Sequence, residues 1–142
     1  MTRPALVLLC AALFCAGCGD DLETPTSASS TTATTPTTRL FAGVVQVRGS
    51  RFYSYTVSTP GTVTAMFASL ATGTGAVARH QLELGIGIPA GTGCAVRQVI
   101  NTAPALVPQL TQEAVAGTYC VNIADTEGLP ASMNFAIRIV HP

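Results

Sequence analysis

The sequence is 142 residues long, carries seven basic and seven acidic side chains, and has a formal net charge of zero. This length accommodates one domain with attachments, and the low charge gives no basic surface of the kind that nucleic-acid-binding proteins present. All the basic side chains are arginines. The absence of lysine excludes Schiff-base chemistry, a Ser-x-x-Lys nucleophile pair and a phosphate-binding loop that ends in Gly-Lys.

Residues 1–17 form an apolar leader. Arg3 supplies one positive charge, and the residues from Ala5 to Gly17 are almost all apolar. A transmembrane helix needs roughly 20 apolar residues, so this segment has the length of a secretory signal peptide rather than of a membrane span. The alternative is a buried helix at the start of a cytosolic domain, and no downstream segment has the helical pattern that would receive it.

Cys18 directly follows the small residues Ala16 and Gly17 at the end of the leader. The run Cys15-Ala16-Gly17-Cys18 resembles the lipobox of bacterial lipoproteins, in which the last cysteine is lipidated and the leader is removed in front of it. The resemblance implies that Cys18 anchors the protein in the membrane of a bacterial envelope, and Gly19 in place of aspartate favours the outer membrane. Two or more acyl chains would anchor stably, at about 0.8 kcal/mol per buried methylene. The alternative is ordinary secretion with Cys18 free or in a disulfide.

Residues 18–38 connect this cysteine to the rest of the chain. Positions 24–38 read TPTSASSTTATTPTT, a Thr/Ser/Pro-rich composition that has little to bury. We therefore expect a disordered linker, with an end-to-end distance of roughly 25 Å over residues 19–38. Such a spacer would hold a folded domain clear of the lipid headgroups.

From Arg39 onward, short β-rich runs alternate with turn residues, and no window has a sustained helical period. The pattern predicts about eight strands, typical of an all-β sandwich or barrel in residues 39–142. The predicted strands are 41–49, 51–58, 62–70, 81–89, 94–101, 110–116, 117–125 and 134–140. Within 81–89, alternation places Leu82, Leu84, Ile86 and Ile88 on one face.

The runs TVSTPG followed by GTVTA, and AGTYCVNIAD before NFAIRIV, are similar to those of the bacterial pre-peptidase C-terminal domain. The resemblance covers about residues 40–142. It implies a small jelly-roll-like β-sandwich that is a non-catalytic appendage of secreted proteins. Some members of that family bind calcium at an Asp-x-Asp step, which is Gly49-Ser50-Arg51 in this sequence.

The same resemblance implies that Tyr53, Tyr55 and Val57 form an inward row. The alternate residues from Phe52 to Thr56 would then lie on the other face. Core packing is the favoured role of Tyr53 and Tyr55, because the chain has few aromatic residues and no tryptophan. The alternative is a ligand surface on which a sugar stacks.

Two cysteines, Cys94 and Cys120, remain after the leader and the lipidation site are set aside. An even pair in an exported domain predicts a disulfide. Metal binding is the alternative, but His80 and His141 are not spaced with the two thiols as a zinc site requires.

The sequence contains no Gly-x-Ser-x-Gly nucleophile elbow. We expect His80 and His141 to be a solvated loop residue and a solvated terminal residue rather than general bases. Asp125, Glu127 and Gly128 are typical of a hairpin turn, with a calcium site as the alternative.

These patterns predict a non-catalytic envelope lipoprotein that presents a β-sandwich for protein binding or scaffolding, and they predict no cofactor or metal. The second hypothesis is a carbohydrate-binding module for envelope or environmental glycans, and the third is an enzyme. A contiguous exposed apolar patch would favour a protein partner.

Overall fold

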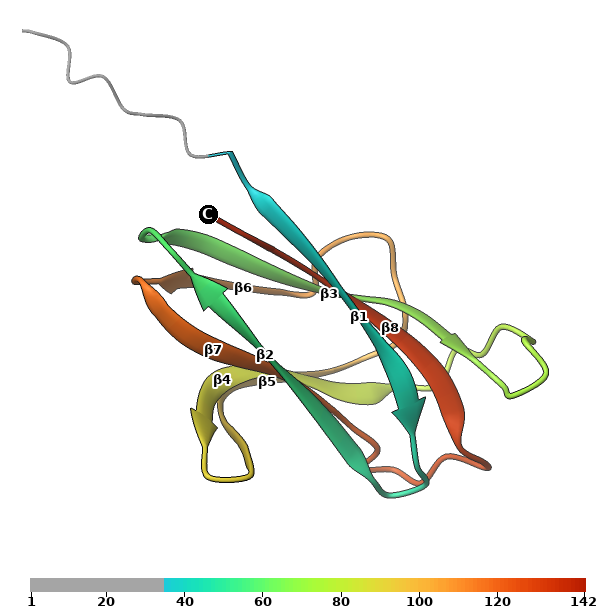
Figure 1. Ribbon diagram of the computed structural model, residues 1–142. Coiled ribbons are helices and arrows are strands. Elements are labelled where there is room, and N and C mark those ends of the chain that lie inside the picture. Colours follow the sequence, from blue (N-terminus) through green and yellow to red (C-terminus); the bar gives the residue numbers. More distant parts are fainter. Residues whose placement is uncertain (1–34) are drawn as a thin grey trace, which may run out of the picture. The chain divides into compact units, whose positions relative to one another are not determined.

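The computed structural model describes residues 35–142. All the regular secondary structure in that part of the chain is β-strand (Figure 1). The leader 1–17, Cys18 and residues 19–34 of the predicted linker lie outside the described residues. The strands are β1 (Thr37–Val45), β2 (Ser50–Val57), β3 (Gly61–Ala71), β4 (Leu82–Ala90), β5 (Gly93–Thr102), β6 (Leu110–Ala114), β7 (Gly117–Ala124) and β8 (Met133–His141). Within this range no helix is long and apolar enough to cross a membrane.

The strands form two four-stranded antiparallel sheets, in the orders β1-β8-β3-β6 and β2-β7-β4-β5 (Figure 1). The chain crosses from one sheet to the other at every connection except the β4–β5 hairpin. This strand order is that of a jelly roll, in which two sheets face each other across one core. The predicted all-β, jelly-roll-like sandwich is therefore confirmed.

All eight predicted strands are present, with shifted ends. β1 begins at Thr37, two residues before the expected domain start at Arg39, because Thr37 and Thr38 pair with His141 and Val140. β1 also ends at Val45, four residues before the expected end at position 49. Residues 46–49 form a turn instead, which is closed by a backbone hydrogen bond from position 49 to position 46.

The core lies between the sheets and is built by strict alternation. In β8, every second residue from Met133 to His141 is buried, and the residues between them face outward. Burying an aliphatic side chain of this kind stabilises the fold by about 1.5–3 kcal/mol. The largest fully buried side chains are Phe67, Leu70, Leu82, Leu84, Ile86, Ile123, Ile137, Ile139, Val45, Val57, Val63 and Val121.

A β-bulge interrupts β3 at Ala68. The pairing of β3 with β8 shifts register between Phe67 and Ser69, so Phe67 and Leu70 are both buried although they are three residues apart. On its other edge, β3 pairs with β6 only as far as Ala65. The second half of β3, from Met66 to Ala71, therefore has a sheet edge that loops must cover.

Ile88 continues the alternation that places Leu82, Leu84 and Ile86 on one face of β4, but it is not buried with them. Leu82, Leu84 and Ile86 are buried, whereas Ile88 is exposed. β4 pairs with β7 only as far as Gly87, so Ile88 lies on the part of the β4–β5 hairpin that extends past the sheet. Sequence alternation continues there, but no opposing layer covers the side chain.

The two ends of the sandwich are defined by β8. Its first residue, Met133, pairs with Val45, where the chain turns into β2, and we call this the Met133 end. Its last residue, His141, pairs with Thr37, the first residue of β1, and we call this the His141 end. The chain thus enters the domain at the His141 end.

Candidate binding surfaces

Tyr53, Tyr55 and Val57 lie on the inner face of β2. Tyr55 and Val57 are buried and Tyr53 is partly buried, while the alternate residues from Phe52 to Thr56 are exposed. The inward row that the sequence predicted is present. The ring of Tyr55 is buried in the core, so no ligand can stack on it.

Tyr53 closes the corner between β1 and β2. Its ring stacks on Phe41, with centroids 5.0 Å apart, and lies 6.2 Å from the ring of Phe135. Its hydroxyl donates a 2.9 Å hydrogen bond to the carbonyl oxygen of Ala42. A Cβ at Gly43 would collide with this hydroxyl, so glycine leaves the room that Tyr53 needs. Satisfying a carbonyl on the free edge of β1 protects that edge from pairing with other strands.

His141 is not a solvated terminal residue, and that expectation was wrong. Only 3% of His141 is exposed, because it is the last inward residue of β8. Its ring centroid lies 5.6 Å from that of Tyr55, and Tyr119 packs on Tyr55 at 6.0 Å. His80, by contrast, is exposed on the loop after β3.

Two polar atoms in this aromatic cluster are buried without a hydrogen-bond partner: the Tyr55 hydroxyl and Nε2 of His141. Burial raises the pKa of Tyr55 well above its ordinary value, and the neighbouring Tyr119 raises it further. Tyr55 therefore stays protonated at physiological pH, and its neutral hydroxyl remains buried without a hydrogen-bond partner.

Asp125 forms a buried polar centre at the Met133 end. Its Oδ2 accepts hydrogen bonds from the backbone N–H groups of Arg48 and Leu129, each at 2.7 Å. Its Oδ1 accepts a 2.8 Å bond from the N–H of Gly128, and its own N–H donates to the carbonyl of Gly49. One side chain thus ties the β1–β2 turn to the β7–β8 loop.

The carboxylate of Asp125 is ionised and accepts hydrogen bonds from backbone N–H groups. Burial alone would raise its pKa, but hydrogen bonds from the N–H groups of Arg48, Leu129, Gly128 and Glu127 together hold the pKa below its ordinary value. The bond to Arg48 also stabilises a left-handed backbone at that residue, where φ is 55°. Across residues 35–142, no three His, Cys, Asp or Glu side chains come together as a metal-binding group.

Cys94 and Cys120 form a disulfide, as predicted. The bond joins β5 to β7, which are separated in the sheet by β4. The start of β5 crosses the outer side of β4 at Gly87, where a Cβ would collide with the backbone of Ala95. Cys120 is fully buried yet faces away from the core. The disulfide therefore fixes the β4–β5 hairpin against the outside of its sheet.

A hollow of about 570 Å³, which we call the hairpin cleft, lies between this hairpin and the outer side of β2 and β7. Its lining is mostly polar. The lining residues are Ser50, Arg51, Phe52, Thr92, Gly93, Cys94, Asn122 and Ala124.

A second hollow of about 650 Å³, which we call the apolar groove, lies beside the last third of β3, towards the Met133 end. Its lining is almost entirely apolar. The lining residues are Ala68, Ser69, Leu70, Ala71, Val77, Ala78, Arg79, Pro104, Ala105 and Leu106.

The walls of the apolar groove are held by backbone pairing to the free edge of β3. The N–H of Ala78 donates to the carbonyl of Leu70, and the N–H of Ala105 donates to that of Phe67. Val77 is 81% exposed and Leu106 is 88% exposed. These two aliphatic side chains are thus presented to solvent by loops whose backbones are fixed.

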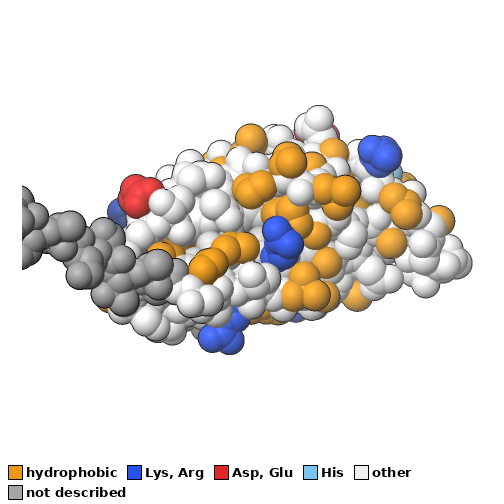
Figure 2. Space-filling model, turned by 90° about the horizontal axis from the view of Figure 1, so that it is seen from above, with side chains coloured by type: hydrophobic (Ala, Val, Ile, Leu, Met, Phe, Trp, Pro, Cys, Tyr) orange, Lys and Arg blue, Asp and Glu red, His pale blue; other side chains and the backbone are white. Residues whose placement is uncertain are grey.

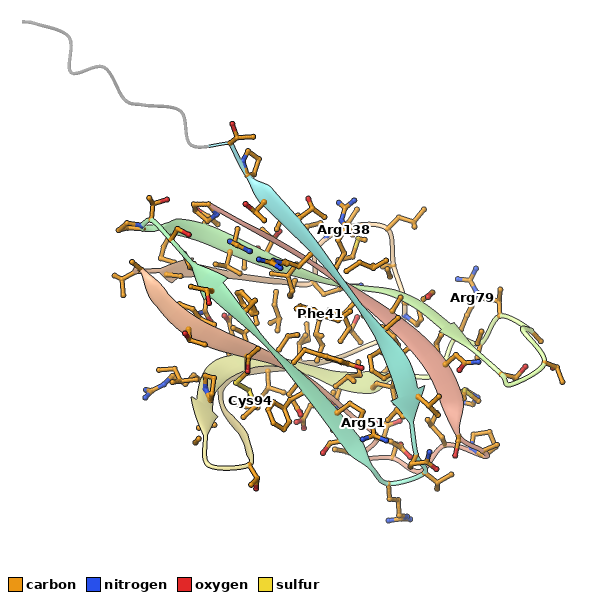
Figure 3. All side chains as sticks on the ribbon, in the orientation of Figure 1. Phe41, Arg51, Arg79, Cys94 and Arg138 are labelled. Atoms are coloured by element: carbon orange, nitrogen blue, oxygen red, sulfur yellow. A yellow bond between two sulfur atoms is a disulfide. The ribbon has the colours of Figure 1, made fainter. Side chains whose placement is uncertain are left out.

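The outer side of the β1-β8-β3-β6 sheet continues this apolar character. Figure 2 looks onto that side and shows hydrophobic side chains gathered over its middle and right-hand parts. Leu40 on β1 and Met66 on β3 pair with Arg138 on β8 from its two sides, and Leu40 is exposed whereas Met66 is buried. In Figure 3, Arg79 lies at the end of the molecule where the loop after β3 projects, and Cys94 lies on the hairpin of the other sheet.

Comparison with known proteins found no matching family model and no matching curated protein. Among solved structures, the chain is similar to the crystal structure of Yersinia pseudotuberculosis-derived mitogen, with a TM-score of 0.51 and 12% identity over 76% of this chain and 88% of that chain. At this identity, the likeness shows the fold alone.

Sequence reasoning located the disulfide and the inward tyrosines, but it did not locate either hollow. Phe52, the aromatic residue that lines the hairpin cleft, lies on the face of β2 opposite the inward tyrosines, and no sequence pattern marked it as part of a hollow. Val77, Arg79 and Leu106 lie in loops, where alternation carries no information. The one available signal was the presence of large aliphatic residues in otherwise turn-like segments.

Proposed function

We propose that this protein is a non-catalytic bacterial envelope lipoprotein that binds a protein partner through the apolar groove. The observation that carries the proposal is the exposure of Val77 and Leu106 on loops with fixed backbones. Contiguous exposed apolar surface on a small domain typically marks an interaction site.

The anchoring part of the proposal rests on the sequence around Cys18, with outer-membrane delivery favoured by Gly19. The domain geometry is compatible with it. The chain enters at the His141 end, and the apolar groove borders Ala71, which pairs with Asn134 near the Met133 end. A domain tethered through β1 would present the groove on the side away from its attachment.

The chemistry of the groove restricts the partner. Arg79 is the one charged residue in its lining, and the remaining lining is apolar apart from Ser69. A complementary ligand would insert a large aliphatic or aromatic side chain and place a carboxylate near the guanidinium. We therefore propose an extended segment of a partner protein in which an apolar residue lies next to Asp or Glu.

The proposal includes no catalytic step. Asp125 is engaged by backbone N–H groups, and His141 is enclosed by aromatic rings, so neither side chain faces the groove or the cleft.

Selection of a random heptapeptide phage library on the immobilised full-length protein tests the proposal. We expect enrichment of peptides in which a large apolar residue adjoins an acidic one. Leu106→Ser should abolish the enrichment, and Arg79→Glu should change the preferred neighbour from acidic to basic. Leu40→Ser, an exposed leucine on β1, is the matched control and should leave the selected sequences unchanged. No consensus, or the same consensus on the Leu106→Ser and Arg79→Glu variants, would contradict the proposal.

A further inference from the structure

The hairpin cleft is separate from the apolar groove, because the two are built on different sheets. One wall is the outer side of β2 and β7, with Phe52 and Asn122 directly paired across the two strands. The other wall is the tip of the β4–β5 hairpin, from Thr92 to Cys94. Because Cys94 is bonded to Cys120 on β7, the two walls are held at a fixed separation.

Phe52 is unusual among the aromatic residues of the domain. It is 38% exposed, and every other phenylalanine and tyrosine within residues 35–142 is less exposed. The others are buried or partly buried in the core or at its corner. An aromatic ring left open inside a mostly polar hollow provides a flat apolar surface surrounded by hydrogen-bonding groups.

Apart from Arg51, the polar side chains of the cleft are neutral. Ser50 and Thr92 provide hydroxyls, and Asn122 provides an amide that both donates and accepts. Arg51 also borders the cleft, and its Nε donates a hydrogen bond to the carbonyl of Val44 at the corner between β1 and β2 (Figure 3). The groups that surround Phe52 are thus uncharged hydrogen-bonding groups, with one arginine at the border of the hollow.

A pyranose ring has the complementary chemistry. Its C–H face is apolar and flat enough to stack on an aromatic ring, and its equatorial hydroxyls donate and accept hydrogen bonds around the edge. We propose that the hairpin cleft binds a neutral hexopyranose oligosaccharide, with one sugar ring on Phe52 and its hydroxyls on Asn122 and Thr92. This activity is independent of the apolar groove and would give the protein a second, glycan-directed contact.

The absence of tryptophan from the sequence allows a direct test. Phe52→Trp enlarges the stacking surface and introduces the chain's single indole fluorophore at the site. Val99→Trp is the matched control, since Val99 is exposed on β5 of the same sheet but does not line the cleft. Both full-length variants are titrated with tetra-N-acetylchitotetraose, cellotetraose and maltotetraose, and with a sulfated heparin tetrasaccharide.

We expect a saturable fluorescence change for Phe52→Trp with at least one of the three neutral sugars, and none for Val99→Trp. In calorimetry with the same sugar, Phe52→Ala should weaken binding by about tenfold relative to the natural protein. Circular dichroism checks that each variant remains folded. The proposal is overturned if Phe52→Trp shows no saturable change with any neutral sugar. Equal responses at positions 52 and 99, or binding of the sulfated sugar alone, would also overturn it.

Discussion

The two ends of the sandwich differ in whether their buried polar groups are hydrogen-bonded. At the Met133 end, the carboxylate of Asp125 accepts three short backbone hydrogen bonds from two different connections. At the His141 end, the Tyr55 hydroxyl and Nε2 of His141 are buried with no partner. A buried polar group costs about 1–3 kcal/mol when it is unpaired, whereas a bond to a charged group contributes about 1.5–3 kcal/mol. The Met133 end is therefore locked by polar contacts, and the His141 end is held by apolar packing.

This difference matches the positions of the functional features. The apolar groove lies towards the Met133 end, but its walls are the β3–β4 and β5–β6 loops, which are held by their own backbone hydrogen bonds to β3 and not by Asp125. The chain enters at the His141 end, where no ligand surface is proposed. The contrast teaches that the connections fixed by polar contacts lie at the end of the domain away from the point where the chain enters.

The largest effect is expected from Asp125→Ala. The substitution leaves three backbone N–H groups in the two turns without an acceptor. We expect a loss of about 4 kcal/mol in the free energy of unfolding, measured by urea denaturation. Glu127→Ala in the same loop is the control, because Glu127 is exposed, and it should change stability by less than about 0.5 kcal/mol. Equal effects of the two substitutions would show that the Met133 end is not locked by Asp125.

The same carboxylate should make stability depend on acid pH. The pKa of Asp125 is lower in the folded protein than its ordinary value of 3.8, so the folded state binds fewer protons than the unfolded state there. Its contribution is present above pH 3.8 and is lost as the pH falls through the lower, folded pKa. Urea denaturation at a series of pH values should show this loss in the natural protein, and the Asp125→Asn variant should lack that component. Parallel curves for the two proteins would contradict the assignment.

Removing the hydroxyls of the two tyrosines of β2 should change the free energy of unfolding by smaller amounts and in different directions. Tyr53→Phe removes the hydrogen bond to the carbonyl of Ala42 and should cost about 1 kcal/mol. Tyr55→Phe removes a hydroxyl that has no partner, so it should leave stability unchanged or raise it by up to about 1 kcal/mol. Thermal and urea unfolding measure both variants. A destabilised Tyr55→Phe protein would mean that the hydroxyl has a hydrogen-bonding role at the His141 end.

Local patterns in the sequence were sufficient to predict the strands and the disulfide. Alternation identifies the core face of β8 and of β4 up to Ile86, and an exported pair of cysteines predicts a bond between Cys94 and Cys120. Alternation also places Ile88 on that face of β4, but it cannot show where the opposing layer ends, and Ile88 is exposed.

Features that depend on contacts between distant parts of the chain could not be predicted from the sequence. Asp125 meets Arg48, 77 residues away, and nothing local to either residue signals this contact. His141 is buried only because β8 pairs with β1 and faces Tyr55. The apolar groove requires the bulge at Ala68 and two loops that cover the edge of β3.

The functional meaning of the two ends depends on the chain being held at one of them, and Cys18 is the proposed point of attachment. Intact mass spectrometry of the protein isolated from bacterial membranes tests this most directly. The account predicts a chain that starts at Cys18, with a diacylglyceryl group on its thiol and an acyl chain on its new amino terminus. Cys18→Ser should give a soluble or uncleaved protein instead. A natural protein with an unmodified Cys18 at its amino terminus would contradict the account.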